Sequence, residues 1–405
     1  MKKAFLLFIS IMFVFVGCTP SYENDEEIIQ DTDEEETETA IIPNYNISDE
    51  EYKVILPYKP GKARGVIVNQ VFNRYDIDEM EEGLRRHSKS VFDPENYYFR
   101  EGQYLSEDVV YRWLGRQKTD QEWEDYVKSH EDRGARVPLT KEQYQSGLNP
   151  TLEGDESKAE SYRDNPRYIS HILEQNYLQK TSENKVDLKG ISIGLALKSV
   201  YQFETQIDGK PGPTYYEDIS EEKMLAKGKE YAQIILERIR EIEEAKNVPI
   251  VIALFREEEQ SSLVPGNYVT KTVVEADSTS IGEWEPINED YMLFPSDEAE
   301  EKYPNDATMM NDFTSEVRDF FPNFVGVIGK GFYTNNELQE LKIEVPIEFH
   351  GKTEIVGFSQ FAYGLMMETF TNQYDVEINV QSPEKQEALL EREVGEEEPN
   401  VYIYQ

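Results

Sequence analysis

Two glycine-flanked segments and one cysteine are the features of this chain whose types and spacing could carry chemistry. Residues 190–194 read Gly-Ile-Ser-Ile-Gly, a spacing that can place a nucleophilic serine on a sharp turn between a strand and a helix. Such a serine needs a base, and His350 is the only histidine that follows Ser192. Apolar residues continue after Gly194, so the pattern favours a buried strand whose glycines allow close packing. We therefore expect Ser192 to be structural.

The second glycine-rich segment, residues 326–331, partly matches a phosphate-binding loop. Phe324 stands where that loop requires its first glycine, and Gly331 replaces the Ser or Thr that would hold Mg²⁺. The segment is therefore interpreted as a strand that ends in a glycine turn.

The remaining candidates for chemistry are the histidines and the acidic residues. The four histidines are His87, His130, His171 and His350. They form no HExxH motif and no close pair, so a zinc site is not supported. The 81 acidic residues include countless carboxylate pairs, so a glycosidase pair has no specific signature. We expect no catalytic residue, no metal and no cofactor; the open alternative is a cell-envelope hydrolase with a carboxylate- or Ser192-centred site.

Cys18 is the only cysteine of the chain, which excludes an intramolecular disulfide. It follows two early lysines and the uncharged, mostly apolar run 4–16, the pattern of a signal peptide. Gly17 before Cys18 resembles the acylation site of bacterial lipoproteins, with Phe15 in place of the usual Leu. We expect a signal peptide over residues 1–17, cleavage between Gly17 and Cys18, and palmitate-type acyl chains on Cys18. These chains would hold the body in the lipid bilayer, on the extracytoplasmic face of a Gram-positive-type cell membrane.

Charge separates the next segment from the body. The net charge of −40 disfavours nucleic acid as a partner, because phosphate binding needs a basic face. Residues 19–52 hold 13 acidic residues and no Lys or Arg, so segment 18–52 is expected to be a disordered acidic tether. A cation-binding tail is the alternative, because Ca²⁺ prefers carboxylate oxygens.

The hydrophobic pattern of the body indicates alternating strands and helices, and therefore an α+β or mixed α/β fold. Expected strands cover 54–57, 65–72, 190–203, 248–255, 324–333, 341–349 and 374–380. Expected helices cover 76–89, 105–114, 220–242, 309–321 and 358–369. The order strand 190–203, helix 220–242, strand 248–255 predicts a right-handed crossover. We expect two packed α/β subdomains, 53–182 and 183–382, and a charged C-terminal tail, 383–405.

Aromatic residues suggest how the body could recognise a partner. Trp113 and Trp284 are candidates for an exposed patch that binds an unknown envelope protein, a peptide or a neutral glycan.

Several segments together resemble the CamS family of Gram-positive lipoproteins, which are sex-pheromone precursors. The segments that carry this resemblance are the Cys18 site, 65–74, 101–105 with 113–114, 190–201 and 345–349. The similarity covers most of residues 53–382. The resemblance implies that the end of the signal peptide is a short apolar pheromone-like peptide: Ile11, Met12, Phe13, Val14, Phe15, Val16 and Gly17. It implies no activity for the body, which we expect to be a binding or interaction module rather than an enzyme.

Overall fold

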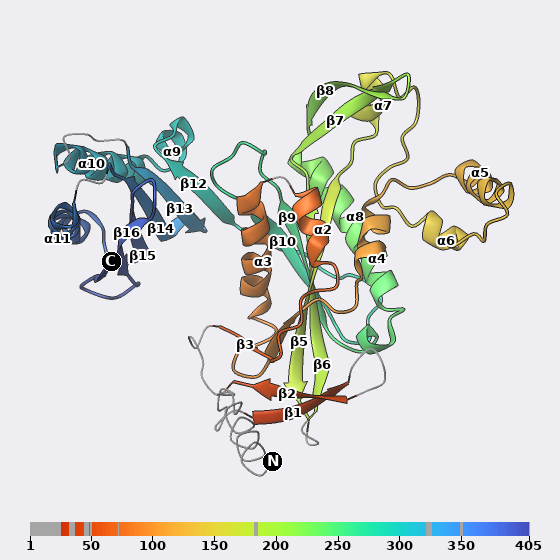
Figure 1. Cartoon of the computed structure of the whole chain (residues 1–405), viewed down its shortest axis with the longest axis horizontal. Coiled ribbons are helices and arrows are strands. Elements are labelled where there is room, and N and C mark those ends of the chain that lie inside the picture. The colour runs from red at the N-terminus through yellow and green to blue at the C-terminus, as the bar shows by residue number, and fades with distance from the viewer. Residues whose placement is uncertain are drawn as a thin grey trace, which may run out of the picture.

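The chain folds into two α+β lobes, each built on its own sheet (Figure 1). This computed structural model describes residues 26–31, 37–43, 48, 51–71, 73–181, 185–320, 326–348 and 351–404. We call residues 51–286 the first lobe and residues 289–404 the second lobe. The expected α+β fold class is confirmed.

The first lobe is organised around a seven-stranded sheet with the order β11-β10-β9-β6-β5-β4-β3. Its strands are β3 (Lys53–Val54), β4 (Tyr98–Glu101), β5 (Ile169–Lys180), β6 (Val186–Leu197), β9 (Ile250–Arg256), β10 (Asn267–Val274) and β11 (Glu285–Pro286). Its helices are α2 (Arg64–Gln70), α3 (Arg74–Ser88), α4 (Glu107–Leu114), α5 (Asp120–Glu131), α6 (Lys141–Tyr144), α7 (Ala159–Asp164) and α8 (Glu221–Ile239), with a short 3-10 turn, η1 (Glu243–Ala245). A hairpin of β7 (Val200–Ile207) and β8 (Lys210–Asp218) projects beyond the sheet (Figure 1).

The expected crossover is present at the centre of this sheet. Strands β6 and β9 pair in parallel, and α8 lies between them in the chain. Ser220 precedes α8, and Glu221 and Glu222 lie in its first turn, where acidic side chains interact favourably with the helix dipole. The strand expected at 190–203 divides at residues 198–199, so that its end forms β7 of the hairpin.

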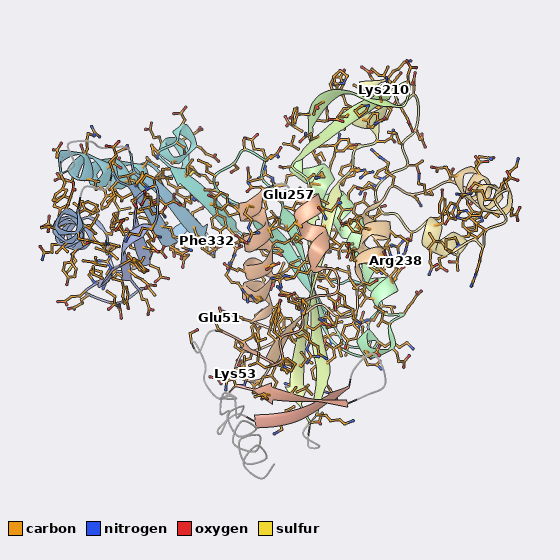
Figure 2. All side chains as sticks on the ribbon, viewed as in Figure 1. Glu51, Lys53, Lys210, Arg238, Glu257 and Phe332 are labelled. Carbon is orange, nitrogen blue, oxygen red and sulfur yellow. The ribbon has the colours of Figure 1, made fainter. Side chains whose placement is uncertain are left out.

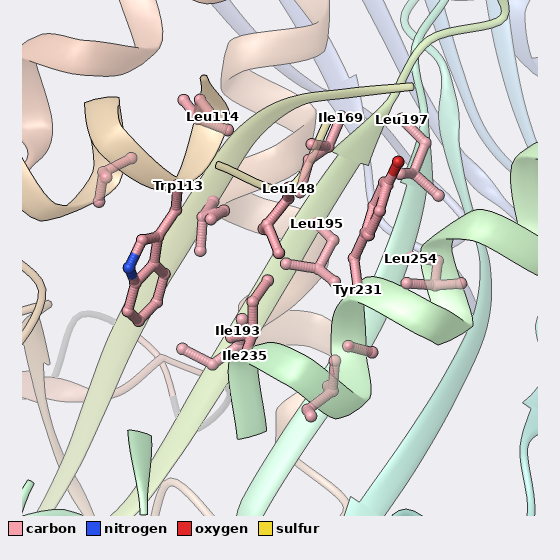
Figure 3. Close-up of a cluster of buried hydrophobic side chains, with 14 of the residues drawn as sticks. Trp113, Leu114, Leu148, Ile169, Ile193, Leu195, Leu197, Tyr231, Ile235 and Leu254 are labelled. Carbon is pink, nitrogen blue, oxygen red and sulfur yellow. The ribbon is translucent and has the colours of Figure 1, made fainter. Parts of the chain in front are cut away.

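Helices cover both faces of the first sheet. On one face, side chains of α4 and α8 pack against β6 and β9, and Figure 3 shows Trp113, Tyr231, Ile235, Ile193 and Leu254 in this core. On the other face, Ile67 of α2 and Leu84 of α3 pack with Phe255 and Tyr268. Because both faces are covered, β9 is a run of buried apolar residues rather than an alternating pattern.

The second lobe has a six-stranded sheet in the order β12-β13-β14-β15-β16-β17. Its strands are β12 (Glu289–Phe294), β13 (Ile328–Thr334), β14 (Glu337–Pro346), β15 (Asp375–Gln381), β16 (Gln386–Arg392) and β17 (Asn400–Ile403). Its helices are α9 (Asp297–Lys302), α10 (Pro304–Phe320) and α11 (Lys352–Thr369). The turn from β13 to β14 contains Asn335 and Asn336 with positive φ, as a tight hairpin turn requires.

The expected boundary between subdomains at residues 182 and 183 differs from the structure. It falls between β5 and β6, which are long antiparallel neighbours in one sheet. The chain changes sheet between β11 and β12 instead, near residue 288. Strand pairing between distant segments, which local patterns do not encode, decides where one lobe ends.

The segment 65–72 is a helix over Arg64–Gln70 and not the expected strand. Its β-branched residues favour a strand locally, but α2 buries only Val66 and Ile67, while Val68 and Asn69 face solvent. Packing of one side against the sheet therefore overrides the local preference.

Two acidic segments are more ordered than expected. Within 18–52, β1 (Glu26–Asp31) pairs with β2 (Thr37–Ile42), and Ala40 and Ile42 are buried beside Ile55 and Leu178. The expected tether is therefore wrong for 37–42, because these apolar residues find a partner on the body. The expected charged tail 383–405 is wrong as well, since β16 and β17 extend the second sheet through Ile403. Cys18 and residues 1–17 lie outside the described part of the chain.

Candidate functional site

Ser192 lies in the middle of β6 with none of its surface exposed. Its hydroxyl is 3.2 Å from Tyr177 Oη, within the sheet. The flanking glycines are needed for packing, since a Cβ on Gly190 would lie 2.1 Å from Phe92 Cε1. The expected strand is thus confirmed, and a buried serine in a strand has no nucleophile elbow. His350, its only conceivable base from the sequence, lies outside the described residues.

The two candidate aromatics do not form a surface patch. Trp113 is only 8% exposed and belongs to the core between α4 and the sheet (Figure 3). Trp284 is half-buried against the same core, with Lys229 Nζ 5.5 Å above its ring. The expected exposure of Trp113 is therefore wrong. Its large apolar ring stabilises the fold more when it is buried in this core than when it faces water.

The glycines at 326–331 introduce β13 and form no phosphate loop. Gly329 and Gly331 lie inside the strand, and Lys330 Nζ donates to Glu344 Oε1 at 3.0 Å. The described histidines do not lie together. His87 contacts Glu289, His130 contacts the backbone carbonyl of Tyr126, and His171 is buried in β5. Among the described residues, no group of three or more His, Cys, Asp or Glu is placed to hold a metal ion.

Two hollows in the first lobe were not foreseen from the sequence. The larger, which we call the acidic cleft, has a volume of about 400 Å³ and lies where parallel strands β6 and β9 end. Its acidic groups are Asp76, Glu257, Glu258 and Glu259, and it is also lined by Asn73, Lys198, Ser199, Val200, Gln202, Tyr216, Gln260 and Ser261. Figure 2 shows Glu257 between Lys53 at the lower end of the first lobe and Lys210 at its upper end. The carboxyl ends of parallel strands are a frequent place for ligand sites.

Asp76 is the most deeply buried carboxyl group among the described residues of the acidic cleft. It accepts hydrogen bonds from the backbone N–H of Gly266 at 2.7 Å and of Glu258 at 3.1 Å. Burial is the main reason why the pKa of Asp76 is raised to about 8, and the charge of Glu257 adds to the effect. The two backbone N–H groups act in the opposite direction but do not cancel it.

Asp76→Asn is expected to flatten the dependence of stability on pH. A native carboxyl group with a pKa of about 8 keeps a proton that the unfolded chain loses near its ordinary value of 3.8. The free energy of unfolding therefore falls as the pH rises between these values, by at most about 1.4 kcal/mol per pH unit from this group. Urea unfolding across that pH range measures the slope. Asp78→Asn, an exposed change on the same helix, is the control, and equal slopes for both variants would contradict the expectation.

The smaller hollow, which we call the α2/α3 cavity, has a volume of about 90 Å³ and lies between these helices and strands β4 and β5. It is lined by Gly61, Ala63, Arg64, Ile67, Glu81, Arg85, Phe99, Glu101, Gly102, Leu105, His171, Ile172, Leu173, Glu174 and Gln175. Apolar side chains share it with five Glu or Arg side chains and one imidazole, the mixture typical of a site that orients a small ligand.

Two of the acidic groups of this cavity are held by the protein itself. Glu101 accepts the backbone N–H of Gly61 at 2.6 Å and the Tyr58 hydroxyl, and it lies 3.8 Å from Arg64. Glu174 is buried and accepts the backbone N–H of Leu105 at 2.7 Å. Burial raises the pKa of Glu174 despite this bond and the donor Asn176.

His171 is the most unusual polar group of the cavity. It is 2% exposed, and its Nδ1 has no hydrogen-bond partner among the residues that the structure describes. Complete burial lowers the pKa of His171 to about 3, so the ring is neutral. Buried polar atoms are seldom left unpaired, because each costs free energy. The sequence offered no signal for this site, since α2 was interpreted as a strand and the lining comes from distant segments.

The comparisons with known proteins agree with this architecture. The family model described as "CamS sex pheromone cAM373 precursor" matches residues 58–398, so this chain belongs to the CamS family. The crystal structure of a sex pheromone precursor from Lactobacillus salivarius subsp. salivarius UCC118 is 28% identical with a TM-score of 0.76, over 89% of this chain and 98% of that chain. The C-terminal domain of the sex pheromone staph-cAM373 precursor from Staphylococcus aureus is 28% identical with a TM-score of 0.68, over 82% and 98%.

No curated protein matches the chain. Within the described part of the chain, no helix is long and apolar enough to span a bilayer.

Proposed function

We propose that this chain is an extracellular lipoprotein, anchored through acyl chains on Cys18, whose first lobe binds a small ligand. The apolar run 4–16 followed by Gly17 and Cys18 supports the anchor. Family membership supports a second role for the leader, in which residues 11–17 are released as an apolar pheromone-like peptide. The body then remains at the membrane after the leader is removed.

Cys18→Ala is expected to abolish incorporation of a palmitate analogue into the chain in growing cells. The thiol is the acyl acceptor, and the chain has no second cysteine to replace it. Labelling followed by gel fluorescence measures the effect. Phe15→Leu, which restores the usual residue of the acylation site, is the control and should label at least as well as the unmodified chain. Equal labelling of the Cys18→Ala variant would refute the anchor.

The α2/α3 cavity is the observation that carries the binding role. It is already formed, it is partly apolar, and it contains a buried imidazole nitrogen without a partner. Its lining contains no Ser, Thr, Cys or Lys that could serve as a nucleophile. These features fit recognition of a ligand better than its conversion.

Binding is tested on the mature chain, residues 18–405 with Cys18→Ala, by ligand-observed NMR with amino acids, dipeptides and neutral sugars. We expect at least one class to bind, and Ala63→Met to abolish that binding because its side chain fills the cavity. Val68→Met is the matched control, since Val68 lies on the same helix but is exposed and outside the lining. Absence of binding by every class, or binding unaffected by Ala63→Met, would refute the role of the cavity.

A carboxylate-based hydrolase is the second candidate, and the raised pKa of Asp76 in the acidic cleft is the observation that favours it. A protonated carboxyl group near neutral pH can act as a general acid. Turnover of a peptidoglycan fragment or peptide by the mature chain, abolished by Asp76→Asn and retained by Asp78→Asn, would establish this function in place of binding alone.

A further inference from the structure

We infer that the α2/α3 cavity takes a small zwitterion with an apolar body, namely a free α-amino acid with an aliphatic side chain. This inference rests on the proposed binding role of the cavity and names the ligand class. Three features of the cavity support it: the apolar lining, the neighbouring opposite charges of Glu81 and Arg85, and the neutral imidazole of His171.

The apolar part of the cavity comes from two helices and the sheet. Ile67 of α2, Phe99 of β4, and Ile172 and Leu173 of β5 line it together with Leu105. A volume of about 90 Å³ exceeds the roughly 10–15 Å³ that one water molecule needs, so the space suits a molecule of amino-acid size better than a single solvent molecule. An aliphatic side chain would gain free energy in this part of the cavity because it removes apolar surface from water.

Of the five Glu and Arg residues that line the cavity, Glu174 is hydrogen-bonded to the backbone, Arg64 and Glu101 lie within ion-pair distance of each other, and Glu81 and Arg85 form no ion pair with a described residue. Arg64 donates to Tyr58 Oη at 2.6 Å and lies within ion-pair distance of Glu101, so these two charges satisfy each other. The side chains of Glu81 and Arg85 make no hydrogen bond or ion pair with any residue that the structure describes. The guanidinium of Arg85 instead lies 5.5 Å from the centre of the Phe99 ring.

Glu81 and Arg85 lie one helical turn apart on α3, the spacing at which such side chains commonly pair with each other. Here they form no direct ion pair, although the charge of Arg85 acts to lower the pKa of Glu81, so a partly exposed anion and a partly exposed cation lie close together at one cavity. Burial and the neighbouring charge of Glu101 raise the pKa of Glu81, and a bound cation would relieve that repulsion. A ligand ammonium group at Glu81 and a ligand carboxylate at Arg85 match this pair, because guanidinium groups bind carboxylates in a two-pronged manner.

His171 supplies the third polar contact, from β5. Its ring is neutral, so Nδ1 can accept a hydrogen bond from the ammonium group or donate one to the carboxylate, depending on the tautomer. A zwitterion therefore offers a direct partner to Glu81, Arg85 and His171 at once, whereas a neutral sugar or an apolar molecule carries no charge to match Glu81 and Arg85.

The experiment compares three probes on the mature chain by isothermal titration calorimetry: L-leucine, leucine amide and N-acetyl-leucine. We expect L-leucine to bind at least tenfold more tightly than the amide, which lacks the carboxylate, and the acetyl compound, which lacks the ammonium group. Arg85→Gln should weaken L-leucine at least tenfold and bring it close to leucine amide. Glu81→Gln should bring it close to N-acetyl-leucine, and Glu82→Gln, an exposed neighbour on α3, should change nothing.

The outcomes separate the inference from the proposed function. Equal binding of the three probes, lost in Ala63→Met, would overturn the zwitterion and leave the binding role intact. Failure of L-leucine to bind while another class of compound enters the cavity would likewise overturn the zwitterion and leave the binding role intact. If no compound of any class binds, the inference and the proposed function both fail.

Discussion

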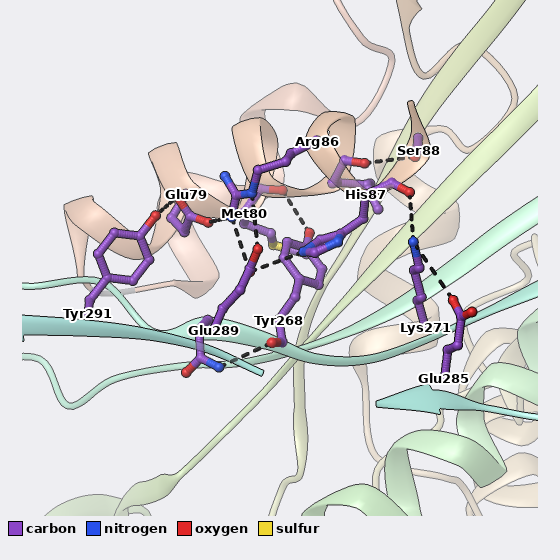
Figure 4. A network of polar contacts seen from close by, with 12 residues as sticks. Glu79, Met80, Arg86, His87, Ser88, Tyr268, Lys271, Glu285, Glu289 and Tyr291 are labelled. Carbon is purple, nitrogen blue, oxygen red and sulfur yellow. Dashed lines mark hydrogen bonds and ion pairs between the residues drawn. The ribbon is translucent and has the colours of Figure 1, made fainter. Parts of the chain in front are cut away.

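Replacing Arg86 by Met is expected to lower the free energy of unfolding by about 3 kcal/mol. Arg86 of α3 lies where the two lobes meet (Figure 4). Its Nε donates to Glu289 Oε1 at 3.1 Å, and its Nη2 donates to Glu79 Oε1 at 2.5 Å. The side chains of Glu79 and Glu289 are only 7% and 4% exposed, so the arginine is the main positive charge for two buried carboxylates.

Removal of the guanidinium leaves these carboxylates close together without their cation. Breaking a buried pair in this way typically costs about 3–5 kcal/mol. We place the effect at the low end because Arg86 is 34% exposed, so water can compensate in part. His87 Nε2, 3.1 Å from Glu289 Oε2, keeps one partner for that residue.

Urea unfolding followed by circular dichroism and by tryptophan fluorescence measures this effect. All three Trp residues belong to the first lobe, so fluorescence reports that lobe alone, while circular dichroism reports both. Arg74→Met is the matched control, because Arg74 pairs with Asp78 at 3.0 Å on the exposed side of the same helix. Such a pair contributes about 0.3–0.5 kcal/mol. Equal unfolding midpoints for both variants would show that the network between the lobes does not contribute to stability.

Gly190→Ala is expected to destabilise the first lobe by about 3 kcal/mol. The added methyl group would lie 2.1 Å from Phe92 Cε1 and 2.4 Å from Cζ, far inside van der Waals contact. Phe92 cannot move easily, since it is fully buried and stacks on Tyr177 with ring centres 4.3 Å apart. Overpacking of such a core typically costs about 1–3 kcal/mol, and the closeness of this contact places it at the upper end.

Gly65→Ala is the control for this substitution. Gly65 lies in α2, and a Cβ there would meet nothing within 4 Å. Alanine is favoured over glycine in helices by about 0.5–1 kcal/mol, so this variant should be as stable as the unmodified chain or more so. The double variant Gly190→Ala with Phe92→Leu should recover part of the loss, because the smaller side chain makes room. A single variant as stable as the unmodified chain would mean that β6 shifts to accommodate the methyl group.

Much of the secondary structure follows from local sequence patterns. Helices α3, α4, α8, α10 and α11 appear close to where the spacing of their apolar residues indicates them. The long apolar runs of β6 and β9 also predicted buried strands, and their order predicted the parallel crossover. These features rest on the periodicity of neighbouring residues and on helix-capping residues, which a single sequence contains.

The failures of local reasoning share one physical cause. In 65–72, β-branched residues favour a strand, but the contacts of Val66 and Ile67 with the sheet stabilise a helix. In 383–405, the many charged residues hide the strand pattern of β16 and β17 from sequence analysis. Ala388 and Leu390 of β16 nevertheless face inward and complete the second core. In both places, contacts with residues far away in the chain outweigh what neighbouring residues prefer.

Composition and local motifs were enough to predict the family, the α+β class and an acylated leader, because each of these depends on residues close together in the chain. The packing of distant segments, by contrast, divides the chain near residue 288, places Trp113 in the core and buries Ser192. It also decided where a ligand could bind. The α2/α3 cavity joins residues 61–105 to residues 171–175, so Glu81, Arg85 and the buried His171 share one site only because the fold brings these distant segments together.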